Sequence, residues 1–173
     1  MKILYIITLT SLFLMSSCVN SDPNVTSKGV DELKSLELER TLSNSDKRFE
    51  DIVYVPIYSD IYFDLVNQNL LISATLSIRN TSIQDSLFIS VIDYYNTEGV
   101  LVRKFIDQPI ALSPMASVNY VIEKEDSDGG PGANFIVNLY SENPNIKPLI
   151  QAVMVGSHSN KAFAFATDGY SIE

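Results

Sequence analysis

The sequence of 173 residues contains no tryptophan, one cysteine and one histidine. One cysteine cannot form an intramolecular disulfide, and a zinc site needs several histidine or cysteine ligands. The histidine, His158, stands in the stretch VGSHSN, which differs from the Gly-x-Ser-x-Gly motif of serine hydrolases. We therefore interpret His158 as a strand-end or loop residue. We expect no disulfide framework, no bound cofactor and no histidine-dependent enzyme.

Basic residues are also scarce. Lys and Arg number 12 against 21 Asp and Glu, which gives a formal net charge of −9. Binding to a nucleic-acid backbone requires a clustered basic surface, and the chain has no basic cluster, so no nucleic-acid partner is expected. Hydrophobic residues at 46% and charged residues at 19% are typical of a globular protein. A chain of this length fits one domain and a leader.

The chain has one long apolar run, and it lies at the start. Lys2 precedes a stretch that is apolar from Ile3 to Met15, and small residues follow before Cys18. A membrane-spanning helix needs about 20 apolar residues, which this run does not reach. The order of charge, apolar run and small residues predicts a cleaved secretory signal peptide over residues 1–17.

The end of this leader suggests a use for the single cysteine. Residues 14–18, LMSSC, resemble a bacterial lipobox, although Met15 replaces the commoner leucine. Acylation of Cys18 would give a stable membrane anchor, because each buried methylene contributes about 0.8 kcal/mol. The alternative is an ordinary signal peptide that ends near a cysteine. We expect a lipoprotein of the bacterial cell envelope, and Val19 after the cysteine favours the outer membrane over the inner membrane.

The mature chain is acidic, with 11 basic and 21 acidic residues after removal of Lys2. An anionic membrane surface would repel such a protein, so the lipid is expected to hold it at the membrane. Residues 18–50 begin with a polar stretch containing Pro23 and Gly29. A thin apolar stripe follows at residues 30, 33 and 36. We interpret this region as a lipidated tether, either a disordered arm or a short helix, with a partner-binding helix as the alternative.

From residue 51 to residue 173 the apolar residues recur with a period of two. In the stretch 70–80, apolar residues at 70, 72, 74, 76 and 78 alternate with polar ones, as in a half-buried strand. Pro56 in the first such stretch indicates an edge strand or a bulge. The sequence predicts an all-β, antiparallel β-sandwich of seven or eight strands, with an immunoglobulin-like topology. The expected strands are 52–58, 70–80, 87–95, 100–105, 117–123, 134–140, 151–157 and 162–167.

The stretch EKEDSDGGPGANF, residues 123–135, gathers acids and glycines. We expect a solvent-exposed hairpin loop between strands 117–123 and 134–140, which also offers a contact surface for a ligand or an envelope protein. The candidate contact residues are Glu125, Asp126, Asp128, Gly129, Gly130, Gly132 and Asn134.

Three other interpretations of this stretch carry less weight. The helix-loop-helix calcium pattern fails in both registers, which leaves a looser calcium site at Asp126 and Asp128 as an alternative function. A phosphate loop is excluded, because the stretch from Gly129 to Asn134 has no lysine and leads into a strand. A carboxylate-dependent hydrolase using Asp93 and the acids at 123–128 is a third reading, disfavoured because short connections rarely build a deep cleft. We expect a non-catalytic binding or assembly module.

Several stretches together resemble one bacterial envelope family, domain of unknown function 3124. They are VYVPIYSDIYF, LSIRNTS, IDYYNTEGVLVRKF, LSPMAS and the acidic Gly-Gly-x-Gly-Ala-Asn-Phe stretch, and the similarity covers residues 53–172. The resemblance implies a small β-rich domain, often behind a lipoprotein signal, and brings no activity, ligand or catalytic residue. The ending FATDG departs from the Ser-Arg-Gly type of ending expected there.

Overall fold

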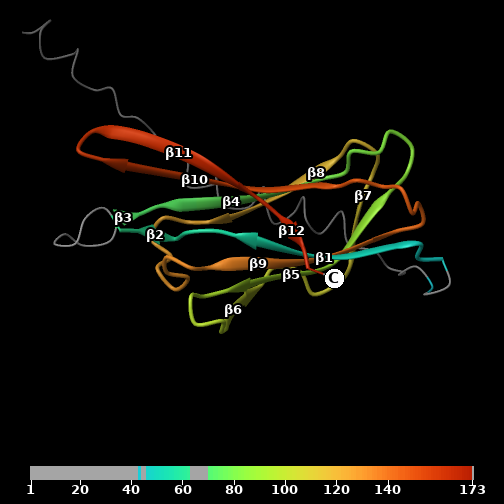
Figure 1. The fold of residues 1–173 in the computed structure, drawn as a ribbon, viewed down its shortest axis with the longest axis horizontal. Helices are drawn as coiled ribbons and strands as arrows, with labels where there is room; N and C mark the ends of the chain where they lie inside the picture. Colours follow the sequence, from blue (N-terminus) through green and yellow to red (C-terminus); the bar gives the residue numbers. More distant parts are fainter. Residues whose placement is uncertain (1–42, 44–45, 63–69, 173) are drawn as a thin grey trace, which may run out of the picture. The chain divides into compact units, whose positions relative to one another are not determined.

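The computed structural model describes residues 43, 46–62 and 70–172, and within them the chain is all-β, with antiparallel strands and no helix (Figure 1). The strands are β1 (Phe49–Pro56), β2 (Asp60–Ile61), β3 (Leu70–Leu71), β4 (Ser73–Arg79), β5 (Leu87–Tyr95), β6 (Leu101–Lys104), β7 (Ile110–Leu112), β8 (Ser117–Ile122), β9 (Asn134–Ser141), β10 (Leu149–His158), β11 (Lys161–Asp168) and β12 (Tyr170–Ser171). Cys18 and the tether stripe at residues 30–36 lie outside the described residues. No helix in the described part is long and apolar enough to span a membrane.

Two sheets form the two layers of a sandwich (Figure 1). The larger has the order β12-β1-β9-β5-β6, with β7 also paired to β5, and the smaller has the order β11-β10-β4-β8. A separate pair, β2-β3, lies at one end. The predicted antiparallel sandwich is therefore confirmed. Seven of the eight expected strands are present as single strands. The expected strand 70–80 is divided at Ile72 into β3, which pairs with β2, and β4, which belongs to the smaller sheet, and the short strands β2, β7 and β12 are additional.

The immunoglobulin-like topology holds only in the middle of the sandwich. The pairs β4–β8 and β6–β5–β9 follow the order of an immunoglobulin domain. In that fold the strand after β9 would pair with β9, but β10 pairs with β4, and β1 takes the place beside β9. Compared with an immunoglobulin domain, β1 and β10 have thus exchanged sheets.

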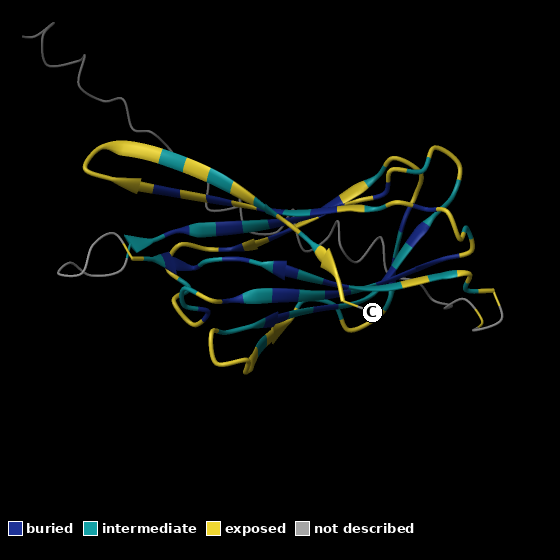
Figure 2. Cartoon of the chain, viewed as in Figure 1, coloured by how far each residue is buried: buried dark blue, intermediate teal, exposed yellow. Residues whose placement is uncertain are grey.

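The core lies between the two sheets and follows the alternation of the sequence (Figure 2). In β4, Ala74, Leu76 and Ile78 are fully buried, as the period of two predicts. In β5, the register against β9 shifts between Ile89 and Val91. This bulge changes which residues face inward, so that Ile89 and Ile92 are both buried.

The predicted hairpin at residues 123–133 is wrong. Strand β8 pairs with β4 in the smaller sheet, whereas β9 pairs with β1 and β5 in the larger one. The loop therefore crosses from one sheet to the other. Consecutive strands suggested a hairpin, but each of these strands buries one face against the opposite layer and pairs with strands distant in the sequence.

Pro56 ends β1, opposite Asn134 of β9. On its other side β1 pairs with β12 only at Val53 and Tyr54, so Pro56 lies on an edge-like part of the strand, as its chemistry predicts. Its carbonyl accepts a hydrogen bond from Thr167 Oγ1 of β11 at 2.6 Å. Strand β1 begins at Phe49 at the opposite end of the sandwich from residues 123–133 (Figure 1).

Candidate functional site

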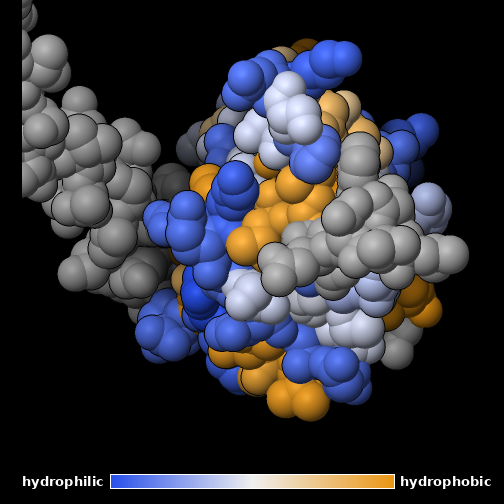
Figure 3. Space-filling model, turned by 90° about the vertical axis from the view of Figure 1, so that its left-hand side faces the viewer, coloured by the Kyte–Doolittle hydropathy of each residue, from blue (hydrophilic) through white to orange (hydrophobic). Residues whose placement is uncertain are grey.

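The loop between β8 and β9, residues 123–133, is called the glycine-rich loop below. It lies at the end of the sandwich that also carries the β5–β6 turn and the segment 57–59 between β1 and β2. Figure 3 looks onto this end and shows a mainly hydrophilic surface broken by separate hydrophobic patches. The loop is not a free tip, because Gly129 and Ala133 are buried.

Close packing against β5 requires glycine in this loop. A Cβ at Gly129 would lie 1.9 Å from the Tyr94 hydroxyl and 2.9 Å from Ala133 Cβ, distances that atoms in contact do not reach. Gly130 has φ +73°, a left-handed conformation that side chains rarely adopt, and its Cβ would lie 2.6 Å from Thr97 Oγ1. The glycines therefore let the loop backbone lie directly on Tyr94 and Thr97.

Thr97, in the β5–β6 turn, binds the loop backbone at Gly129 and Gly132. Its backbone N–H and its Oγ1 both donate to the Gly129 carbonyl at 2.9 Å, and Oγ1 also accepts from the Gly132 N–H at 3.0 Å. On the other side, the N–H and Oγ of Ser59 donate to the Gly130 carbonyl at 3.2 Å. The β5–β6 turn and the segment after β1 therefore both bind the loop backbone. Together with Arg103 of β6, which binds the Asp126 side chain, they form the arrangement that we call the loop clasp.

Arg103 of β6 binds the acidic part of the loop. Its guanidinium lies 2.7 Å from the Asp126 carboxylate, whose side chain is 12% exposed. The other oxygen of Asp126 accepts from the Asp128 N–H at 3.3 Å. Glu125 and Asp128 are exposed to solvent, and Asn134 is half-buried at the start of β9. The candidate contact residues thus divide into two groups, one that builds the clasp and one that faces outward.

The electrostatics of the clasp affect the buried phenol of Tyr94. Burial raises the pKa of Tyr94; Ser59 counteracts this rise, and Asp126 adds to it. The phenol is fully buried, and its ring packs 5.5 Å from Phe135. Tyr94 therefore stays neutral at physiological pH, and Gly129 packs against its hydroxyl.

The structure places the candidate catalytic residues on different elements of the fold. Among the described residues, no group of three or more His, Cys, Asp or Glu side chains is placed to hold a metal ion. His158 is exposed at the tip of the β10–β11 hairpin. Asp93 lies within β5, opposite Lys104 of β6.

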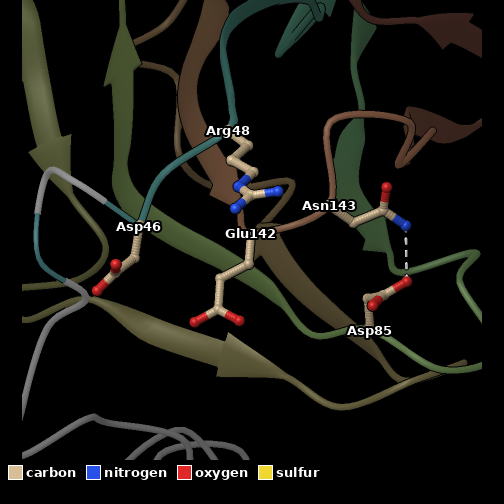
Figure 4. Close-up of a pocket in the computed structure, with 5 residues that line it drawn as sticks. All are labelled: Asp46, Arg48, Asp85, Glu142 and Asn143. Carbon is tan, nitrogen blue, oxygen red and sulfur yellow. Dashed lines mark hydrogen bonds between the residues drawn. The ribbon is translucent and has the colours of Figure 1, made fainter.

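An open polar pocket at the opposite end escaped the sequence analysis. It has a volume of about 470 Å³ and is surrounded by the five side chains in Figure 4, which are Asp46, Arg48, Asp85, Glu142 and Asn143. Asn143 Nδ2 donates to Asp85 Oδ2 at 2.7 Å, and the Ser82 hydroxyl donates to the same oxygen at 3.0 Å. The pocket residues come from three segments that are far apart in the sequence, residues 46–48, residue 85 and residues 142–143, so only the fold brings them together. Their hydrogen bonds tie the loops at this end to each other.

A second hydrogen-bond centre at this end is Asn80. Its Nδ2 donates to the carbonyls of Asp85, Leu112 and Ser113 at 2.8–3.0 Å, and its Oδ1 accepts from the Ser82 N–H. The side chain is 2% exposed. Asn80 therefore fixes the turn after β4 against the end of β7.

Comparison with known proteins places this fold in a family. The model of a protein family of unknown function, DUF3124, matches residues 50–172. The chain belongs to the DUF3124 family. This match confirms the resemblance found in the sequence.

Other comparisons add little to the family assignment. The crystal structure of Thermotoga maritima 1070 is similar to this DUF3124 chain with a TM-score of 0.39 and 16% sequence identity. The alignment covers 69% of this chain and 92% of that one. No curated protein matches the sequence.

Some of the stretches that carry the DUF3124 resemblance supply contacts of the glycine-rich loop and of Asn80. IDYYNTEG supplies Tyr94 and Thr97, and the acidic glycine stretch supplies the loop that rests on them. LSIRNTS supplies Asn80. The sequence analysis missed Thr97, Ser59 and Arg103 as partners of the loop because their contacts are long-range.

Proposed function

We propose that this DUF3124 protein is a lipid-anchored lipoprotein of the bacterial cell envelope whose β-sandwich is a non-catalytic binding or assembly module. The observation that carries the proposal is the apolar leader that ends at Cys18, the only cysteine of the chain. An acylated thiol explains both the presence of this cysteine and the lack of any other.

The position of the glycine-rich loop supports a role in contact. The described chain enters the sandwich at Phe49, and the loop lies at the other end. The proposed anchor precedes β1 in the sequence, whereas the loop lies at the end of the sandwich away from the start of β1. A contact surface at that end is open to partners in the envelope.

The loop clasp also favours binding at this loop. The clasp fixes the backbone through Thr97, Ser59 and Arg103, while Glu125 and Asp128 keep their side chains in solvent. A loop that is already ordered loses little conformational entropy on binding. Its exposed carboxylates fit a partner that presents basic or hydrogen-bond-donating groups.

The environments of the acids favour binding over hydrolysis. A carboxylate pair for hydrolysis needs one acid and one base on either side of a cleft. Asp126 is bound to Arg103 and Asp93 lies opposite Lys104, so each of these two acids has a basic neighbour. We therefore assign the outward-facing acids to recognition.

In-cell cross-linking of the tagged full-length protein tests the binding role. The variant carries Glu125→Gln and Asp128→Asn, which remove both exposed charges and leave the Arg103–Asp126 pair intact. A matched control carries Asp46→Asn and Glu142→Gln at the opposite end, with the same change of charge. The proposal predicts a discrete envelope partner captured by the wild type and the control and lost in the loop variant. Equal capture by all three proteins, or no partner for any, would contradict binding through this loop.

A further inference from the structure

Among the residues that the structure describes, strand β11 forms an edge of the smaller sheet. The order of that sheet is β11-β10-β4-β8, and within the described residues β11 pairs with β10 along its whole length without a bulge. Figure 2 shows the strand alternating between exposed and intermediate residues. The exposed residues are Ala162, Ala164, Ala166 and Asp168, together with Lys161 at the start.

The hairpin turn determines which residues of β11 face the open side. Ser159 and Asn160 both have positive φ values, 48° and 62°, as in a tight two-residue turn. In such a hairpin the flanking residues His158 and Lys161 form a hydrogen-bonded pair. The hydrogen-bonded residues then alternate along the strand. The main-chain N–H and C=O groups of Ala162, Ala164 and Ala166 therefore point away from β10, toward the open side.

Between its two ends, strand β11 lacks the charges and proline that normally prevent an edge strand from pairing with another chain. Proteins protect edge strands with charges, proline, bulges or short length. Edge strand β6 carries Arg103 and Lys104 and has a register shift against β5, and β12 has only two residues. Edge strand β8 runs directly into the charged stretch that begins at Glu123. In contrast, residues 162–167 of β11 contain no charge and no proline.

The exposed stretch is also self-complementary. Residues 162–166 read Ala-Phe-Ala-Phe-Ala, which is the same in both directions about Ala164. We infer that β11 pairs antiparallel with β11 of a second copy of this chain, across a two-fold axis through Ala164. The smaller sheets of the two copies then join into one continuous sheet.

The register of this pairing satisfies both the backbone and the side chains. Ala164 lies opposite its own counterpart and Ala162 lies opposite the Ala166 position, so the residues with open main-chain groups are the ones that exchange hydrogen bonds. Phe163 lies opposite the Phe165 position on the inner face. Both phenylalanines are half-buried in the single chain, and Phe165 already packs edge-on against Tyr58 at 5.9 Å. Cross-strand aromatic pairs of this kind stabilise antiparallel strands.

Charge favours this edge over others for a second copy. A chain with a net charge of −9 repels its own kind over most of its surface. Between Ala162 and Thr167 there is no charge, and the antiparallel arrangement brings the Lys161 end of each strand to the Asp168 end of the other. The ends of the interface thus have opposite charges. This inference does not depend on lipidation or on the contact role of the glycine-rich loop.

Cysteine cross-linking in the full-length protein tests the register. Across the proposed axis the Cα atoms of the two Ala164 residues lie about 5.5 Å apart, within the range of roughly 4.4–6.8 Å that disulfides span. The variant Ala164→Cys should form a disulfide-linked dimer on a non-reducing gel. The control Ala162→Cys should remain a monomer, because its own counterpart lies four residues away, roughly 13 Å along the strand. The parent protein reports any background from Cys18. A monomeric Ala164→Cys, or equal linkage of both variants, would overturn the inference.

A second variant tests the interface without a cross-link. Ala164→Lys places two like charges opposite each other at the axis, while its exposed position leaves the fold of the single chain intact. The detergent-extracted wild type should sediment as a dimer and the variant as a monomer with an unchanged melting temperature. A monomeric wild type at micromolar concentration, or a dimeric Ala164→Lys protein, would contradict pairing through β11.

Discussion

Gly129 shows how one residue type determines the local structure of the candidate site. Because Gly129 has no side chain, the loop backbone contacts the hydroxyl of Tyr94 and packs against the end of β5. The acids beside it suggested calcium or catalysis, but the structure gives the glycines a packing role and gives Asp126 to Arg103. The loop clasp therefore explains the glycines and Asp126 of this stretch. The outward-facing acids, Glu125 and Asp128, are the residues that remain for binding.

Gly129→Ala should destabilise the protein by about 2–3 kcal/mol, because the new methyl group overlaps Tyr94 and neither neighbour can move without disturbing the core. Gly99→Ala is the matched control. It also replaces a loop glycine, with φ +77°, but its Cβ would meet no atom within 4 Å. It should cost about 1 kcal/mol from backbone strain alone. Urea unfolding measures both, and equal losses would contradict the packing role of Gly129.

The buried hydroxyl of Tyr120 offers a second stability test. It has no hydrogen-bond partner among the described residues, and burial raises the pKa of the phenol. Tyr120→Phe removes an unsatisfied group, so the free energy of unfolding should stay the same or rise by up to about 1 kcal/mol. A loss of more than about 1 kcal/mol in urea unfolding would show that the hydroxyl has a partner in the folded protein.

The raised phenol pKa values also predict an alkaline limit to stability. An unfolded tyrosine ionises with a pKa near 10, whereas burial raises the pKa of Tyr94, Tyr120 and Tyr140 in the folded chain. Above pH 10 the unfolded state therefore loses protons that the folded state keeps, so stability falls as the pH rises. The slope for each such tyrosine reaches at most about 1.4 kcal/mol per pH unit. Urea unfolding from pH 9 to pH 11 measures it, and Tyr120→Phe should reduce the slope.

At the scale of strands and loops, the sequence predicted what depends on local pattern. The period of two gave the positions of the long strands. The pairing of β8 with β4 rather than β9 was not predictable, because the pattern states which face is buried but not against which strand. The bulge in β5 and the exchange of β1 and β10 between sheets also depend on contacts between residues far apart in the sequence, so the local pattern could not predict them.

The loop clasp, likewise, was invisible in the sequence. Thr97, Ser59 and Arg103 belong to the β5–β6 turn, the segment after β1 and strand β6, and only the fold brings them to the glycine-rich loop. The sequence did locate the loop itself, because three glycines within four residues indicate a backbone under unusual constraint. It could not show whether that constraint comes from a ligand or from the protein's own strands.

Thr97→Val tests the link between the turn and the loop. The substitution keeps the volume of the side chain and removes the hydroxyl that binds the Gly129 carbonyl and the Gly132 N–H. The expected loss is about 1–3 kcal/mol, with faster hydrogen exchange in residues 123–133. Thr75→Val, on the outer face of β4, is the control and should be neutral or slightly stabilising. Unchanged exchange in the loop would contradict the clasp.

The whole molecule combines a proposed lipid anchor at Cys18 with an acidic β-sandwich. The sandwich lies in the part of the chain that matches the DUF3124 family, residues 50–172. The acidic charge of the domain gives it no attraction to an anionic membrane, so the anchor at Cys18 is the part of the proposal on which the location depends.

Mass spectrometry of the amino-terminal peptide from the native protein tests this claim most directly. The account predicts a mature chain that begins at Cys18 and carries a diacylglyceryl group on the thiol and an acyl chain on the new amino terminus. A Cys18→Ala variant should lose both the lipid and the membrane fraction of the protein. An unmodified Cys18, or a mature chain that begins at another residue, would contradict the lipoprotein assignment.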